Sequence, residues 1–157
     1  MDARSQPTDI VAYVAAKYSV FNPGDKSPGY TERLTAMLAG MQRHRDEIER
    51  TLEYTPDTHN FDVLVDMVIQ GQLTFWDLPN GFFLTEIQLY PLARHFHVFM
   101  AGGDLQALID LHDDMLSLAQ ALGCSRATIA GRAGWERVFK GQGWQKHLTV
   151  ISREIDQ

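Results

Sequence analysis

Apolar and polar residues alternate through the middle of the chain, which predicts strands. The runs Gln72–Leu78 and Phe82–Tyr90 are rich in aromatic and β-branched residues and are separated by Pro79-Asn80-Gly81. That composition predicts an antiparallel hairpin. A second short connection, Pro91–Arg94, leads into the run His95–Ala101. We expect this third strand to pair with the second and complete a three-stranded meander.

The two faces of this meander differ in polarity, because side chains alternate along a strand. We place Pro91 opposite Arg94 across the second connection. The face expected to be mixed then carries Glu86, Gln88, Tyr90, His95, His97 and Phe99. The face expected to join the core carries Thr85, Ile87, Leu89, Phe96, Val98 and Met100.

After the meander the hydrophobic period changes from two to between three and four. Apolar residues from Leu105 to Leu122 recur at steps of three and four, which predicts one amphipathic helix. Asp104 suits the N-cap, because its carboxylate can accept a bond from a first-turn amide. Gly123 suits the helix end. His112 lies in the apolar stripe, so we expect a core or boundary residue.

The remaining C-terminal part predicts three short elements. These are a strand over Cys124–Ala130, a helix over Gly134–Phe139 and a final strand over Gln145–Ile155. A strand, a helix and a further strand in succession predict a crossover with parallel pairing.

The N-terminal part is mainly helical in composition. It predicts helices over Thr8–Tyr18, over Tyr30–Thr55 with a possible break at Gly40, and over Phe61–Ile69. We divide the chain into a helical N-terminal extension or arm, residues 1–43, and one domain, residues 44–157.

Length and composition fit a single domain that needs no cross-links. The chain has 157 residues and one cysteine, Cys124, which excludes an internal disulfide framework and is expected to be a small core residue. No apolar run approaches the roughly 20 residues that cross a bilayer, and the start lacks a signal-peptide core. We therefore expect no membrane insertion and no export.

The net charge of −6 argues against nucleic-acid binding, which depends on clustered Lys and Arg. The charge is uneven along the chain. Residues 51–100 contain one basic and six acidic side chains, whereas the segment Arg126–Arg153 is basic. Such asymmetry can orient a protein–protein contact, and it is also found on ordinary solvated surfaces.

The order of predicted elements over His44–Ile155 resembles the GNAT superfamily of N-acetyltransferases. Within it, Gly131–Val138 followed by Gly143-Trp144 is similar to a GNAT-like group encoded by tailed bacteriophages. The resemblance implies an α/β (α+β) fold, in which helices flank a mixed, mostly antiparallel central sheet.

The cofactor loop of that family is altered in this chain. In active members, a loop of the form Arg/Gln-x-x-Gly-x-Gly/Ala precedes the long helix, and its amides hold the cofactor pyrophosphate. The matching residues are Met100, Ala101, Gly102, Gly103 and Asp104. Neither Arg nor Gln stands at the first position of this loop, and the Asp104 carboxylate would repel phosphate. We expect a tight turn and no bound cofactor.

The family's general acid is also missing. Aligning Gly143-Trp144 with the end of the pattern Phe-Tyr-x-x-x-Gly-Phe places Phe139 at the tyrosine, and phenylalanine has no proton to give. Glu86 is the candidate base. His95 and His97 could join Glu86 at a metal, but two histidines on one strand fit packing or an interface better, so no metal is expected.

We expect a non-catalytic structural or assembly protein, associated with a phage virion and located there or in the host cytoplasm. It would act through protein–protein contacts in a homo- or hetero-oligomer. The alternative is an acyl-CoA-dependent N-acetyltransferase, which would bind acetyl-CoA through the candidates Met100, Gly102, Gly103 and Asp104 and use Glu86 or a water as base. A third interpretation is a module that regulates a host protein.

Overall fold

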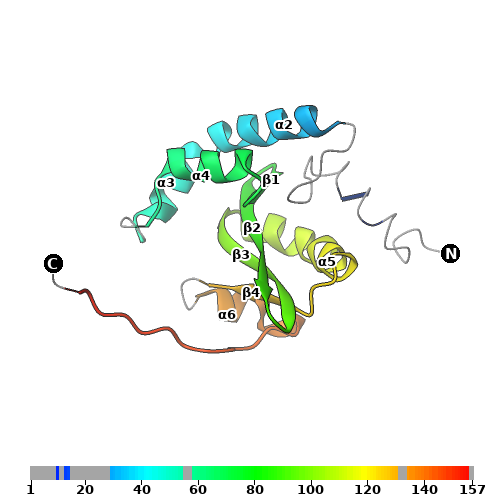
Figure 1. Ribbon diagram of the computed structural model, residues 1–157, viewed down its shortest axis with the longest axis vertical. Coiled ribbons are helices and arrows are strands. Elements are labelled where there is room, and N and C mark those ends of the chain that lie inside the picture. Colours follow the sequence, from blue (N-terminus) through cyan, green and yellow to red (C-terminus); the bar gives the residue numbers. More distant parts are fainter. Residues whose placement is uncertain (1–9, 11–12, 15–28, 55–57, 131–133, 156–157) are drawn as a thin grey trace.

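The computed structural model describes residues 10, 13–14, 29–54, 58–130 and 134–155. A four-stranded sheet in the order β1-β2-β3-β4 is flanked by helices (Figure 1). The first two pairings are antiparallel and the last, between β3 and β4, is parallel. The described elements are α2 (Tyr30–Arg43), α3 (Arg45–Leu52), α4 (Phe61–Ile69), β1 (Thr74–Leu78), β2 (Gly81–Tyr90), β3 (Ala93–Gly103), α5 (Leu105–Ala121), β4 (Arg126–Ile129) and α6 (Gly134–Phe139).

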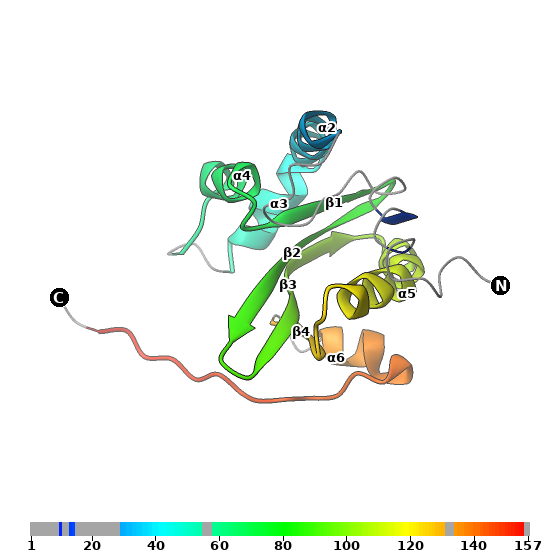
Figure 2. The ribbon, with the colours of Figure 1, turned by 45° about the vertical axis from the view of Figure 1, so that its right-hand side comes forward.

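This arrangement confirms the predicted fold class. The parallel crossover runs from β3 through α5 to β4, whereas the one predicted between Cys124–Ala130 and Gln145–Ile155 is not formed in the described residues. In two views, α2, α3 and α4 gather beside β1, and α5 lies on the other side of the sheet (Figure 2). The helices α4 and α6 have the bounds that the sequence predicted. Asn60 caps α4, since its side chain accepts a hydrogen bond from the amide of Val63 at 2.9 Å.

The register of the β2–β3 hairpin differs from the prediction by two residues. Tyr90 faces Ala93, so the turn is Pro91-Leu92 and Pro91 does not face Arg94. A slip of two leaves every side chain on its face, because the period of a strand is two. The predicted core side of β3 is therefore confirmed, with Phe96, Val98 and Met100 buried.

A β-bulge divides β3 into two halves. Thr85 faces Val98 and Leu84 faces Met100, which leaves Phe99 as the additional residue on β3. On its other side, β3 pairs with β4 only from His95 to Val98. Beyond the bulge, β3 therefore has β2 as its one strand neighbour among the described residues.

The predicted long helix between Tyr30 and Thr55 breaks at His44 and not at Gly40. The His44 imidazole lies 2.9 Å from a carboxylate oxygen of Asp77 and contacts the ring of Phe75. Gly40 lies inside α2, and the absence of a side chain lets β1 approach closely, since a β-carbon there would lie 2.9 Å from the Phe75 ring. The break thus follows from tertiary contacts and not from glycine propensity.

The junction between β3 and α5 is packed against the β1–β2 turn. Gly103 has φ of +101°, and a β-carbon on it would lie 2.4 Å from the Asn80 carbonyl oxygen and from the Gly81 α-carbon. The Asp104 amide donates to the Asn80 carbonyl at 2.6 Å. Only glycine fits at position 103, for conformational and steric reasons together.

The predicted final strand, Gln145–Ile155, is wrong for this single chain. After α6 and a 3₁₀ turn over Lys140–Gln142, the segment has no regular secondary structure, and all of it is exposed. A strand needs a neighbour to satisfy its backbone groups. The described part of the chain places no strand beside this segment.

The predicted helix Thr8–Tyr18 falls mostly outside the described residues, of which Ile10 and Val14 are buried. Helix α2, from the predicted extension, buries Met37 and Met41 and packs on β1. The division at residue 43 stays a prediction. No described helix has the length and apolar character needed to cross a membrane.

Gly103, at the junction between β3 and α5, can be compared with Gly123 in a matched pair of variants. Gly123 also has positive φ, +80°, but a β-carbon there would meet nothing within 4 Å. Gly123→Ala should cost about 1–2 kcal/mol from backbone conformation alone. Gly103→Ala should cost about 1–3 kcal/mol more, because it adds a clash with backbone. Urea unfolding of both variants checks this; equal losses would contradict the packing described at Asn80.

Candidate functional site

The candidate cofactor-binding residues form part of the sheet and do not form an open loop. Gly102 faces Phe82 and Gly103 faces Gly81 in the ladder with β2, so the strand continues to the start of α5. Met100 is buried. A β-carbon at Gly102 would lie 2.8 Å from the Phe82 ring. The two glycines therefore let neighbouring segments of this chain approach each other closely.

Asp104 is the N-cap of α5, as predicted. Its carboxylate accepts a hydrogen bond from the Gln106 amide at 3.0 Å, and its own amide donates to Asn80. Two amides that could face a phosphate at this helix start are thus already used inside the protein. The carboxylate also adds negative charge where an anionic ligand would approach.

Phe139, at the position that the resemblance assigns to the general acid, is buried in a group of rings. Its ring stacks on His112 at 5.5 Å and on Trp135 at 5.9 Å between centroids, and lies 5.6 Å from Trp144. The Trp144 indole donates to Nε2 of His112 at 2.7 Å. His112 is 3% exposed, which confirms it as a core residue. This group of rings holds the chain that follows α6 against α5.

Glu86 lies on the half-buried polar face of the sheet, opposite His97 on β3. The side-chain amide of Gln88 donates to the Glu86 carboxylate at 3.1 Å, and the Tyr90 hydroxyl donates to Gln88 at 3.0 Å. On the other side, Nδ1 of His97 lies 2.7 Å from the hydroxyl oxygen of Thr128. A polar row thus crosses β2, β3 and β4.

The electrostatics of this row favour a neutral His97. Burial lowers the pKa of the His97 imidazole, Glu86 opposes that shift, and His95 adds to it. A neutral imidazole has one donor and one acceptor nitrogen, so His97 can both hold Thr128 and accept a proton.

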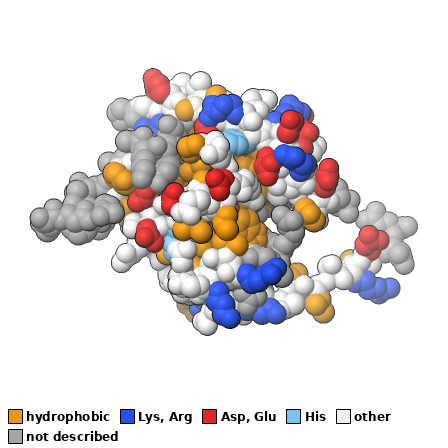
Figure 3. Space-filling view, turned by 180° about the vertical axis from the view of Figure 1, so that it is seen from behind, with side chains coloured by type: hydrophobic (Ala, Val, Ile, Leu, Met, Phe, Trp, Pro, Cys, Tyr) orange, Lys and Arg blue, Asp and Glu red, His pale blue; other side chains and the backbone are white. Residues whose placement is uncertain are grey.

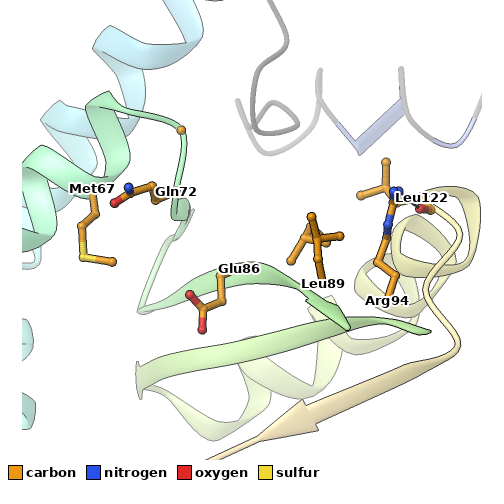
Figure 4. Close-up of a pocket in the computed structure, with 8 residues that line it drawn as sticks. Met67, Gln72, Glu86, Leu89, Arg94 and Leu122 are labelled. Carbon is orange, nitrogen blue, oxygen red and sulfur yellow. Dashed lines mark hydrogen bonds between the residues drawn. The ribbon is translucent and has the colours of Figure 1, made fainter. Parts of the chain in front are cut away.

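An open pocket of about 650 Å³ lies beside this row, along the part of β2 that extends past β1. Glu86 reaches it from β2, and Met67 and Gln72 lie at one side of it (Figure 4). Arg94 and Leu122 lie at the other side, where an Arg94 nitrogen donates to the Leu122 carbonyl at 2.8 Å. Gly71, Ile87 and Leu89 complete the lining.

The structure keeps the candidate base and the glycine junction apart. Glu86 stands four residues along β2 from Phe82, which faces Gly102, so the separation is about 13 Å at the usual rise of a strand. Among the described residues, no group of three or more His, Cys, Asp and Glu side chains could hold a metal ion. Glu86, His95 and His97 are thus neighbours on one face without making such a group.

Cys124 is half-buried just before β4. Burial raises the pKa of its thiol, and Arg94 partly opposes the shift. A thiol of this kind stays protonated near neutral pH, which does not favour a nucleophile.

Two contacts at the site were not predicted from the sequence. The bond between His97 and Thr128 joins strands separated by a whole helix, and the bond between Trp144 and His112 joins equally distant segments. The parallel crossover could have suggested the first, because it brings Thr128 beside His97. Nothing in the local pattern indicates the second.

Protonation of His97 should destabilise the fold. Because its folded-state pKa is lowered, the unfolded chain binds more protons as pH falls below about 6.5, so stability is lost through and below that pH. His97→Gln should make the fall in unfolding free energy between pH 7 and 5 shallower. Equal slopes for His97→Gln and the wild type would contradict this.

Comparisons with known proteins support the architecture and no more. No protein-family model matches the chain. No curated protein matches it either. Among solved structures, it is similar to a probable acetyltransferase, with 10% identity and a TM-score of 0.56 over 73% of this chain and 94% of that one.

It is also similar to an acetyltransferase of Trypanosoma brucei, with 11% identity and a TM-score of 0.52 over 70% of this chain and 92% of that one. An aminoglycoside acetyltransferase from an uncultured soil metagenomic sample gives 8% identity and a TM-score of 0.51, over 87% and 96% respectively. Sequence identities this low show a similar fold and do not show function. The chain has the mixed α+β fold of GNAT-type acetyltransferases, with helices around a mostly antiparallel sheet.

Proposed function

We propose that this chain is a GNAT-fold protein that does not turn over acyl-CoA and that acts through protein–protein contacts. One observation carries the proposal: the glycine junction before α5 is occupied by the protein itself. Gly102 and Gly103 pair with β2, and the Asp104 amide is bonded to Asn80. A pyrophosphate at this place would have to displace these bonds and approach the Asp104 carboxylate.

The state of Phe139 supports the same proposal. Its ring is 1% exposed and lies among aromatic rings, so neither it nor a water in its place can deliver a proton to a leaving thiolate. A chain that lacks both the phosphate cradle and the acid retains the architecture as a scaffold.

The proposed setting is a tailed-phage assembly, in the virion or in the host cytoplasm. It is supported by the similarity of Gly134–Val138 and Gly143-Trp144 to phage-encoded sequences, whose preceding residues 131–133 lie outside the described part. The net charge of −6 supports protein partners over nucleic acid. Figure 3 shows Lys and Arg side chains grouped below a central hydrophobic area on one face, an arrangement that can orient such a contact.

The alternative, an acyl-CoA-dependent N-acetyltransferase, is favoured by one observation. Beyond Val98, β3 has no strand partner on the β4 side among the described residues, which leaves backbone groups for an extended, amide-bearing ligand. A pantetheine arm lying along this edge would connect the glycine junction with the polar row. Glu86 or the neutral His97 would then be the base.

Acetyl-CoA binding separates these proposals. At about 1 mM acetyl-CoA, a ligand with a Kd of about 100 µM would stabilise the fold by about 1.4 kcal/mol. We expect no rise in melting temperature and no heat of binding by calorimetry. Asp104→Asn is the variant matched to the wild-type chain, because asparagine can still cap α5 but lacks the negative charge of the Asp104 carboxylate. Binding by the wild-type chain would overturn the scaffold proposal.

Acetyl transfer to an amine panel gives a second, independent measurement. We expect the wild-type chain, Glu86→Gln and Gln88→Ala to be equally inactive, because none has a bound donor. If the alternative holds with Glu86 as the base, Glu86→Gln should lower turnover by about 100-fold or more, as loss of a general base does; if His97 is the base, His97→Gln should do so instead. Gln88→Ala controls for loss of the hydrogen bond to Glu86.

A further inference from the structure

The C-terminal segment, Gln145–Ile155, has a strand-like sequence and no neighbour in the single chain. Its apolar side chains are exposed: Leu148 by 66%, Val150 by 82%, Ile151 by 91% and Ile155 by 87%. Figure 3 shows the segment standing clear of the body on the right. Apolar residues gathered on one projecting segment mark a contact with something else.

The sheet ends in a strand that can accept another. β4 is last in the sheet order and pairs with β3 along one edge only. Natural edge strands are commonly protected by Lys, Pro or a bulge. Apart from Arg126, β4 consists of half-buried Ala127, Thr128 and Ile129, a composition that suits the interior of a sheet better than its edge.

Donor and acceptor match in length and polarity. Leu148–Ile151 is a run of four residues with three aliphatic side chains, and β4 has four residues. A strand with helices on both sides typically has such a continuous apolar run. Lys146 and Arg153 flank the run with positive charge.

The root of the segment lies near the chain's own β4. Trp144, directly before the segment, is bonded to His112 on α5, and α5 packs on β4. When a donor and its acceptor edge lie close together in one subunit, a two-fold axis beside them lets two subunits exchange donors reciprocally, and the contact closes.

We propose that Gln145–Ile155 adds as a strand to the β4 edge of a second copy of this chain, which returns its own segment in the same way. This inference rests on the proposed function in one respect, because a protein that acts through protein contacts needs a surface for them. In the single chain the segment, described as far as Ile155, runs away from the sheet in two views (Figures 1 and 2), a form that is open for exchange.

Proline scanning at one position tests the exchange. Val150→Pro removes a backbone donor and disfavours the ladder, whereas Val150→Thr keeps a β-branched residue. Both variants should fold alike, because Val150 is exposed in the single chain. By sedimentation velocity at about 100 µM, the wild type and Val150→Thr should have twice the 17.8 kDa chain mass. Val150→Pro should dimerise at least about tenfold more weakly.

The sole cysteine allows the contact to be located. If Leu148–Ile151 pairs antiparallel with Arg126–Ile129, residue 153 faces Cys124; if the pairing is parallel, residue 146 faces it. Chains carrying Cys124→Ser with either Arg153→Cys or Lys146→Cys are mixed with wild-type chain and oxidised. A mixed disulfide from one of the two, and not from the other, supports the exchange and gives its direction.

Three results would overturn the exchange. These are a monomeric wild-type chain at about 100 µM, equal dimerisation of Val150→Pro and Val150→Thr, or an intramolecular disulfide in a monomer that retains Cys124 and carries Arg153→Cys. The last would mean that the segment folds back on its own β4. A dimer that binds acetyl-CoA would overturn the proposed function and leave the exchange intact. A monomer that does not bind acetyl-CoA would overturn the exchange and leave the proposed function intact.

Discussion

The hydrogen bond from the Asp104 amide to the Asn80 carbonyl, at 2.6 Å, joins the three elements on which the rest of the fold depends. It links the β1–β2 turn, the end of β3 and the start of α5 at one point. Gly103 makes that point possible, because any side chain there would meet the backbone of Asn80 and Gly81. The direction of α5 and the close packing at the glycine junction are consequences of the same contacts.

Much of this architecture could be predicted from local pattern. The helices Phe61–Ile69 and Gly134–Phe139 were predicted to the residue, and for the first of them Asn60 and Gly71 mark the two ends. The register of the hairpin at Pro91-Leu92 was predicted two residues away, since both registers present the same faces. The break at His44 could not be predicted, because it coincides with a tertiary contact to Asp77. The C-terminal segment has a strand-like sequence, and local pattern could not tell that no strand lies beside it among the described residues.

The candidate site shows the same division between what is local and what is not. The N-cap role of Asp104 and the burial of His112 follow from their positions in a periodic helix. The polar row from Glu86 through His97 to Thr128 requires a parallel crossover, and the pairing of Glu86 with His97 follows from the register of the hairpin turn. The sequence placed Glu86 and His97 on one face of the sheet, but it did not indicate Thr128 as their neighbour.

The bulge at Phe99 and the parallel pairing of β4 also bear on how the chain folds. The hairpins β1–β2 and β2–β3 join consecutive segments and close short loops, so they can form early. β4 can join β3 only after α5 has brought it back across the sheet. Everything after β4 therefore emerges last, and neighbouring nascent chains would meet while their C-terminal segments are still uncommitted.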